Sequence, residues 1–421
     1  MYKKITLKDG LRIITIPQKS TEAVTVLVLV KTGSKYETKE VNGISHFLEH
    51  MFFKGTKKRP TQIEVAEALD VVGGVFNAFT GEEFTGYFAK TRSSYLNLAV
   101  EWVSDIFFNS IFPKKEMEQE RKVIEEEIKM YSDNPMFYAQ KLFPQLLYGD
   151  QPAGWDIAGT EESLKNITRQ RLLSYRKKQY VAKNTIIVIA GNLDHEKGIN
   201  LAKRYFSKIS PTEPLRKPKV IENQTAPALL LSERKTDQAH LCLGVRTFNI
   251  FNPKRYALNI LGTILGDMMS SRLFTEVRGK RGLAYHISTD IEMNPDTGYL
   301  VTYAGVDSKR IDEAIQAILN EYKKTSIEPI TLSELKKGKE NIKGRTALSL
   351  ESSDALASFY GSQELLEEKI STPEEFFKEI DKVTREDILN VAREIFKPEK
   401  LNLTLVGPFK EKERFQKLLK L

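Results

Sequence analysis

The stretch "ITRQRLLSYRKKQYVAKNTIIVIAGNL" at residues 167–193 has a counterpart in "VTREDILNVAREIFKPEKLNLTLVGPF" at residues 383–409. Each begins with a threonine suited to cap a helix, continues as a helix and then as an apolar strand, and ends near a glycine. Thr168 and Gly191 are as far apart in the sequence as Thr384 and Gly407, so a shift of 216 residues relates the two copies. The chain therefore shows signs of an internal duplication.

The same shift places "AVTVLVLV" at residues 23–30 over "AHLCLGVR" at residues 239–246. Because two independent segments agree on one register, we interpret the chain as two homologous halves; chance similarity is the alternative. Each half is predicted to be an α+β unit with helices packed on one side of a mostly antiparallel sheet. The predicted domains are residues 1–208 and 229–421, joined by a proline-rich linker at 209–228.

The composition is that of a globular protein. Hydrophobic residues make up 41% and charged residues 29% of the 421 residues, and no apolar run is long enough to span a bilayer. The net charge is +8, but lysine and arginine are interleaved with glutamate, so no nucleic-acid or membrane partner is predicted. Cys242 is the only cysteine, which excludes an intrachain disulfide. With no signal peptide expected at the amino terminus, we predict a cytoplasmic location.

The segment "HFLEHMFFKGT" at residues 46–56 contains two of the five histidines. At about 100° per residue, His46, Glu49 and His50 fall within one third of a helix circumference. The opposite side carries the apolar residues Ile44, Phe47, Leu48 and Met51. Imidazoles one helical turn apart can reach one tetrahedral cation. The alternative is a pair of partly exposed helix histidines, but two histidines at i and i+4 with a glutamate between them favour a metal site.

The two homologous halves differ at the histidine motif. The shift carries His46, Glu49 and His50 onto positions 262, 265 and 266, which are glycine, leucine and glycine. The second half is therefore predicted to have no metal site of its own.

A third ligand is expected from "PKKEMEQERKVIEEEIKMY" at residues 113–131, which has the composition of a helix. Glu120 and Glu127 fall in the middle of its predicted buried stripe, and Glu126 points away. The stripe is formed by the apolar residues Met117, Val123, Ile124, Ile128 and Tyr131. Carboxylates on an apolar face need a compensating charge, which a metal ion or, alternatively, arginine or lysine side chains could supply.

Together, "HFLEH" and "ERKVIEEEI" resemble the pitrilysin family (M16 type) of zinc metallopeptidases, the inverted-motif group that includes insulin-degrading enzyme and the mitochondrial processing peptidase. The similarity extends over essentially the whole chain, and the length suits the shorter bacterial members. The resemblance implies one Zn²⁺ per chain, bound by His46, His50 and Glu127. It also implies that Glu49 is the general base and that Glu120 supports the site.

Two further segments carry the resemblance. "GGVFNAFTGEEFTGYF" at residues 73–88 resembles the substrate-binding edge strand of the family, which implies that Asn77, Ala78 and Phe79 bind substrate. "EVRGKRGLAY" at residues 276–285 resembles the segment whose arginine and tyrosine bind substrate and stabilise the intermediate, which implies catalytic roles for Arg278 and Tyr285. The alternative for this pair is a surface ion pair and a packed aromatic ring.

The resemblance implies an endopeptidase that hydrolyses peptides or unfolded polypeptide segments through a metal-activated water. The first half would be catalytic, and the second would contribute substrate-binding residues. A homodimer is also implied, in which Arg278 and Tyr285 could act on either chain's site. The alternatives are a catalytically silent peptide-binding or core subunit of the same fold, and an enzyme that depends on a different homologous chain.

Overall fold

The computed structural model describes residues 2–421 and divides the chain into two compact units. The first unit consists of Met1–Ile128, Trp155–Pro218 and Ala347–Ser371. The second unit consists of Lys129–Gly154, Lys219–Thr346 and Thr372–Leu421.

These units correct the predicted boundaries, because neither is a contiguous half of the chain. Residues 129–154 lie in the first half of the sequence but belong to the second unit, and residues 347–371 show the reverse exchange. The predicted linker at 209–228 is irregular: residues 209–227 form neither helix nor strand, and the chain passes from the first unit to the second between Pro218 and Lys219.

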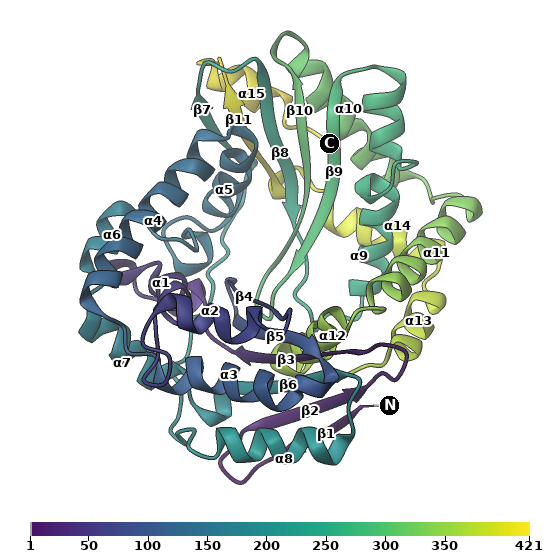
Figure 1. Ribbon diagram of the computed structural model, residues 1–421. Coiled ribbons are helices and arrows are strands. Elements are labelled where there is room, and N and C mark those ends of the chain that lie inside the picture. Colours follow the sequence, from purple (N-terminus) through teal and green to yellow (C-terminus); the bar gives the residue numbers. More distant parts are fainter. Residues whose placement is uncertain (1) are drawn as a thin grey trace. The chain divides into compact units, whose positions relative to one another are not determined.

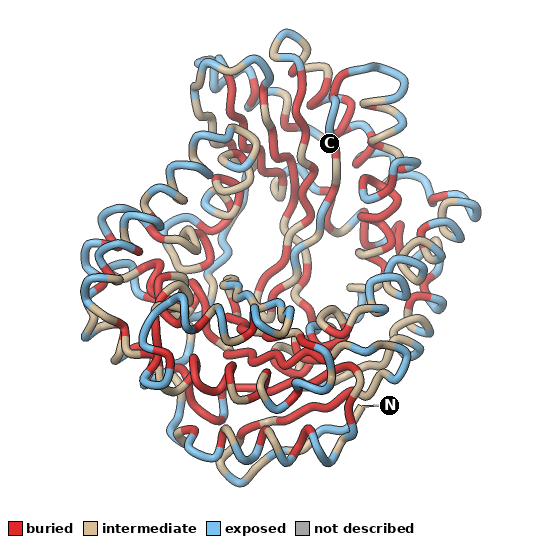
Figure 2. Tube along the Cα trace, viewed as in Figure 1, coloured by how far each residue is buried: buried red, intermediate tan, exposed pale blue. Residues whose placement is uncertain are grey.

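The sheet of the first unit has six strands among the described residues, in the order β1-β2-β6-β3-β5-β4. Neighbouring strands are antiparallel except β2 and β6, which are parallel. β6 is buried along its whole length, which explains its continuous apolar run (Figure 2). The strands are β1 (Lys3–Thr6), β2 (Arg12–Pro17), β3 (Ala23–Val30), β4 (Val75–Thr80), β5 (Thr85–Arg92) and β6 (Thr185–Gly191).

Most helices of the first unit pack against one face of this sheet, and α12 covers the other (Figure 1). On the α12 side, Leu356 and Tyr360 join one apolar cluster with Ile14 and Val188 of the strands. The helices are α1 (Ile44–Met51), α2 (Gln62–Asp70), α3 (Leu96–Asn109), α4 (Lys114–Asp133, in this unit up to Ile128), α6 (Glu161–Asn166), α7 (Arg169–Gln179), α8 (His195–Phe206) and α12 (Ser353–Glu367).

The second unit repeats this plan with a five-stranded sheet in the order β7-β11-β8-β10-β9 among the described residues. β7 and β11 are parallel, and the other neighbours are antiparallel. The strands are β7 (Ala228–Glu233), β8 (Gln238–Arg246), β9 (Ala284–Met293), β10 (Gly298–Asp307) and β11 (Leu401–Gly407).

Here α5 takes the place that α12 has in the first unit, with Phe143 packed among Cys242, Val301 and Val406 of the strands (Figure 1). Short π-helical segments at Thr263–Asp267 and Phe274–Lys280 follow α9. The helices are α5 (Pro135–Tyr148), α9 (Arg255–Gly262), α10 (Ile311–Ile327), α11 (Leu332–Ser349, in this unit up to Thr346), α13 (Pro373–Lys382), α14 (Arg385–Ile395) and α15 (Lys412–Leu418).

The predicted fold class is confirmed: both units are mixed, mostly antiparallel sheets covered by helices. The expectation of helices on one side only was incomplete, because α12 and α5 cover the second faces. The duplicated stretch is also present in the structure. Thr168 caps α7 before β6, and Thr384 caps α14 before β11.

Candidate metal centre

Helix α1 carries the histidine motif in the first unit. Its apolar side chains Ile44, Phe47, Leu48 and Met51 are at most 2% exposed, as the helix faces predict. This packing fixes the rotation of α1, so that the other side of the helix presents His46, Glu49 and His50. The side chain of His46 is 12% exposed and that of His50 is 20% exposed, so both imidazoles are mostly shielded from water but not fully buried.

The beginning of α1 is held by Glu37, a buried residue that the sequence analysis did not single out. Its Oε2 accepts from the backbone N–H of Gly43 at 2.6 Å, and its Oε1 accepts from that of Ser45 at 2.8 Å. Burial raises the pKa of the Glu37 carboxyl to about 7, although these donors lower it. Gly43, at φ 94°, offers no side-chain cap, so Glu37 satisfies the first N–H groups of the helix.

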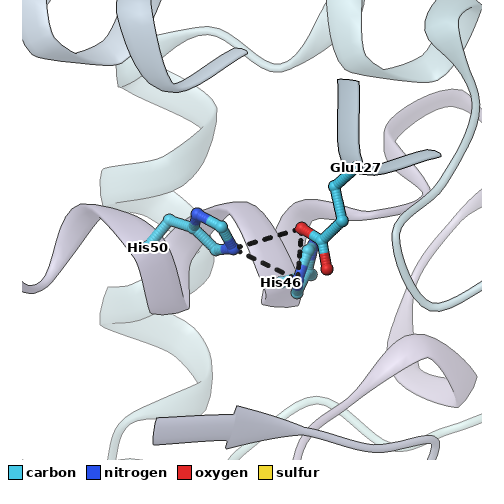
Figure 3. Close-up of side chains that lie close together, drawn as sticks. All are labelled: His46, His50 and Glu127. Carbon is cyan, nitrogen blue, oxygen red and sulfur yellow. Dashed lines mark hydrogen bonds and ion pairs between the residues drawn. The ribbon is translucent and has the colours of Figure 1, made fainter. Parts of the chain in front are cut away.

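Three donor atoms converge beside α1 (Figure 3). His46 Nε2 and His50 Nε2 are 3.2 Å apart, and Glu127 Oε2 lies 3.6 Å from the first and 3.7 Å from the second. This is the one group of histidine, cysteine and carboxylate side chains found within residues 2–421 that could hold a metal ion. The structure thus brings together the three residues predicted as ligands.

The surroundings of both imidazoles suit a metal ligand. His50 Nδ1 lies 3.1 Å from Glu120 Oε1 and, because a carboxylate oxygen accepts, the ring donates to it from Nδ1, which leaves Nε2 on the side of the other two donor atoms. Burial, together with the charge of His50, lowers the pKa of His46 to about 3, which keeps that ring neutral. For Glu120, burial acts to raise the pKa, but hydrogen bonds from His50 and Lys54 lower it overall.

Glu49 lies on the same side of α1 and contacts the neighbouring strand. Its Oε2 accepts a 2.5 Å hydrogen bond from the Thr80 hydroxyl at the end of β4. Burial raises the pKa of Glu49, opposed by the Thr80 hydrogen bond and by the charge of His50. A carboxyl with a raised pKa beside a candidate metal centre is typical of residues that transfer protons.

Helix α4 supplies Glu120 and Glu127, but its buried stripe is narrower than predicted. Ile124 is fully buried, whereas Val123 is 50% exposed and Tyr131 is 41% exposed. The prediction was wrong for these two residues because the apolar pattern does not show how wide the covering surface is. Glu126 is exposed, as expected, so Glu127 and its neighbour face different surroundings.

The predicted substrate strand is β4, at the edge of the first sheet and paired there with β5. Side chains alternate along it, so that Asn77 and Phe79 are exposed while Ala78 and Thr80 face the helices. The Oδ1 atom of Asn77 accepts from the backbone N–H of Ala78 at 2.9 Å. Asn77 therefore lies on the opposite face of β4 from the residue that contacts Glu49.

Arg278 and Tyr285 belong to the second unit and contact each other. The Arg278 guanidinium carbon lies 5.1 Å from the centre of the Tyr285 ring and 4.6 Å from that of Phe274. Tyr285 is 78% exposed at the beginning of β9, which is an edge strand. The alternative interpretation of Arg278, a surface ion pair, is not what the structure shows, since its neighbours here are aromatic rings.

The second unit has no room for imidazoles at the duplicated positions. A Cβ atom on Gly262 would lie 2.5 Å from Ile291 Cδ1, and one on Gly266 would lie 2.1 Å from Thr289 Oγ1. Because these glycines let the helical segment lie directly on β9, larger side chains there would overlap the strand.

Sequence reasoning missed two residues that position the site. Thr80 could have been found from strand alternation, since it shares a face with Ala78 once α1 is placed on that side. Glu37 gave no signal, because it lies in an irregular segment and its role depends on a contact with a helix that begins several residues later.

Comparison with known proteins identifies the family. The model described as "Insulinase (Peptidase family M16)" matches residues 12–161, and "Peptidase M16 inactive domain" matches residues 166–342. The chain belongs to the M16 peptidase family. An uncharacterized zinc protease of Bacillus subtilis is 36% identical to this M16 chain, covering 97% of it and 98% of the relative. An uncharacterized zinc protease of Mycobacterium leprae is 35% identical, covering 99% and 94%.

A solved protease from Helicobacter pylori has the same architecture as this M16 chain, with a TM-score of 0.90 and 26% identity over 97% of this chain and 99% of that one. His46, Glu49, His50 and Glu127 lie within the matched insulinase segment, and Arg278 and Tyr285 lie within the other. Among the described residues of this M16 chain, none of the helices combines the length and apolar character needed to cross a membrane.

Proposed function

We propose that this chain is a zinc-dependent endopeptidase that hydrolyses peptides or unfolded polypeptide segments. The observation that carries the proposal is the approach of His46 Nε2, His50 Nε2 and Glu127 Oε2 to within 3.2–3.7 Å of one another. Glu49 presents a carboxylate from the same side of the helix that bears both imidazoles.

The donor set fits zinc. Two imidazole nitrogens and one carboxylate oxygen form the ligand set of known catalytic zinc sites, which keep a fourth position open. Tetrahedral coordination with bonds of about 2.0–2.1 Å separates donor atoms by roughly 3.3 Å, close to the distances between these three atoms. The names of the bacterial relatives, which are zinc proteases, support the same metal.

In this proposal, Glu49 and Thr80 have different roles in the reaction. When bound, zinc supplies Lewis acidity, which makes a water molecule acidic enough to act as a nucleophile near neutral pH. Glu49 accepts the proton of that water and later delivers it to the departing amine of the cleaved peptide. Thr80 holds one carboxylate oxygen of Glu49 and so leaves Oε1 as the oxygen that handles the proton. Burial, which raises the pKa of Glu49, favours this exchange.

The substrate is proposed to bind as an added strand along β4. An edge strand offers unpaired backbone groups, and backbone pairing accepts many side-chain sequences but needs an extended segment. The proposal therefore predicts broad specificity for peptides and unfolded segments. Arg278 and Tyr285 are proposed to bind the substrate and to donate to the oxyanion of the intermediate, a role in which one donor contributes about 10²-fold or more.

The test is a comparison of the wild-type protein with Glu49→Gln, using a quenched peptide and purified protein loaded with zinc. The wild type should cleave the peptide and lose activity with EDTA. Glu49→Gln should keep its zinc but lose at least about 10²-fold in kcat, because the amide cannot accept the proton. Zinc content, measured on both proteins by atomic absorption, is the control. Activity of Glu49→Gln near that of the wild type would refute the proposed base.

The same experiment distinguishes the proposed enzyme from the alternative, a silent peptide-binding subunit. A wild-type protein that binds one zinc per chain and cleaves none of a varied set of unfolded peptides would be such a subunit. The presence of the complete set His46, Glu49, His50 and Glu127 in one place favours the enzyme.

A further inference from the structure

Lys54 lies just beyond the last turn of α1, four residues after His50. Its backbone N–H donates to the Met51 carbonyl at 3.3 Å, which continues the helical turn. The side chain is only 11% exposed and reaches two other elements: its Nζ lies 2.5 Å from Glu120 Oε2 on α4 and 3.0 Å from Gln62 Oε1 on α2. A lysine this well buried is held by specific partners rather than by water.

The two oxygens of Glu120 have different partners. Oε1 accepts from His50 Nδ1 at 3.1 Å, while Oε2 accepts from Lys54 Nζ at 2.5 Å. Because both oxygens are engaged, the carboxylate cannot rotate about its terminal bond without breaking a charged hydrogen bond. Its orientation in turn sets the orientation of the His50 ring, whose Nε2 lies 3.2 Å from His46 Nε2.

We propose that Lys54 is a positioning residue of the metal centre, which acts through Glu120 to hold the His50 imidazole in its ligating orientation. This inference rests on the proposed function. Partners of metal-bound histidines commonly contribute 10–100-fold to metal affinity. Glu120 is such a partner of His50, and Lys54, in the turn that follows α1, is in turn the partner of Glu120.

Neighbouring cations do not replace Lys54. Lys58 and Arg59 follow in the same loop, but Lys58 pairs with Glu101 at 2.8 Å, and Arg59 pairs with Glu101 and Asp105 at 2.6 Å each. Without Lys54, the Glu120 carboxylate, itself 9% exposed, would keep its contact with His50 but lose a buried charge pair. Lys54 therefore differs from a surface ion pair, which contributes little.

The experiment measures zinc dissociation constants by competition with a chromophoric chelator, independently of peptidase activity. Lys54→Met keeps the length of the side chain without its charge and should weaken zinc binding about tenfold, and Glu120→Gln about 10–100-fold. The double variant Lys54→Met/Glu120→Gln should bind no more weakly than Glu120→Gln alone, because Lys54 acts through Glu120. Lys54→Arg should recover most of the affinity. Lys58→Met, from the same loop, should bind zinc like the wild type.

Two outcomes would overturn the inference: wild-type affinity in Lys54→Met, or losses that multiply in the double variant. Urea unfolding of the metal-free proteins separates these results from a general loss of stability, and if Lys54→Met does not fold, Lys54→Gln takes its place in the same cycle. Failure of the proposed function is distinguishable from failure of this inference. In the first case the wild-type protein would bind no zinc, or the Glu49→Gln variant would keep the peptidase activity of the wild type.

Discussion

The hydroxyl of Thr80 lies 2.5 Å from Oε2 of Glu49 and donates a hydrogen bond to it, linking the last residue of the edge strand β4 to the candidate base on α1. The strand proposed to bind substrate and the residue proposed to move the proton are therefore tied together by one contact. A peptide that binds along the edge of β4 would therefore lie beside the residue that orients the Glu49 carboxylate.

Replacing Thr80 with valine removes this donor at nearly constant size. We expect kcat to fall roughly 10–100-fold, the loss appropriate to a hydrogen bond with a charged group, with little change in KM. Steady-state kinetics on zinc-loaded protein measures the effect. Thr80→Ser, which keeps the hydroxyl, should retain most of the activity. An unchanged kcat in Thr80→Val would show that Glu49 is oriented by other contacts.

The difference between adjacent glutamates on α4 provides a second test. Glu127→Gln replaces a donor atom of the convergent group and should weaken zinc binding by more than the 10–100-fold typical of an outer partner. Glu126→Gln, at an exposed position, should leave the zinc dissociation constant near the wild-type value. Chelator competition measures both. Equal losses from the two substitutions would contradict the assignment of Glu127 as a ligand.

The glycine at position 266 should tolerate no side chain. Gly266→Ala would place a Cβ atom 2.1 Å from Thr289 Oγ1 on β9, and overpacking of this kind costs about 1–3 kcal/mol. Gly344→Ala is the matched control in the same unit, because no heavy atom lies within 4 Å of its Cβ position on α11. There the exchange should stabilise the helix by up to about 1 kcal/mol. In denaturant unfolding followed by circular dichroism, the midpoint concentration should fall for Gly266→Ala and rise for Gly344→Ala, relative to the wild type.

Glu334 should contribute stability that depends on pH. Burial acts to raise its pKa, but the Arg272 guanidinium, at 2.7 and 3.0 Å, and the Thr331 backbone N–H lower it to about 2. A carboxyl with a lowered pKa stabilises the folded state above its unfolded value of 4.5, and this contribution is lost as the pH falls from there towards about 2.

Glu334→Gln should therefore lower the free energy of unfolding at pH 7 by about 1–3 kcal/mol and by progressively less as the pH approaches 2. Urea unfolding between pH 7 and pH 3 measures the difference between the variant and the wild type. Glu340→Gln, which breaks an exposed pair with Lys343, is the control and should change stability by less than about 1 kcal/mol. A difference between wild type and Glu334→Gln that does not depend on pH would contradict the assigned pKa.

The periodic parts of the sequence predicted their structures well. The 3.6-residue pattern of α1 identified Phe47 and Leu48 as buried and His46 and His50 as the other face, because an apolar stripe fixes the rotation of a helix. The repeat that begins at Thr168 and Thr384 was recognisable because a cap, a helix and a strand followed each other at equal spacing. These features are local, so they can be recognised in a single stretch of sequence.

Features that depend on distant contacts were not predictable in this way. The exposure of Val123 depends on how much of α4 its neighbours cover, and the contact of Thr80 with Glu49 depends on which strand lies beside α1. The exchange of α5 and α12 between the units belongs to the same class. The apolar face of an amphipathic helix predicts that the helix packs on another element, but the sequence of the helix does not show which sheet that will be.

The exchange of α12 has a consequence for biosynthesis. One face of the first sheet, which includes Ile14 and Val188, is complete in the nascent chain once β6 ends at Gly191, but α12 begins only at Ser353. At typical rates of translation, that apolar surface is exposed for ~10–30 s before the ribosome has synthesised α12, the helix that packs on it. A chaperone that shields apolar strands should therefore favour the yield of intact protein, and chains that stop before α12 should aggregate rather than fold.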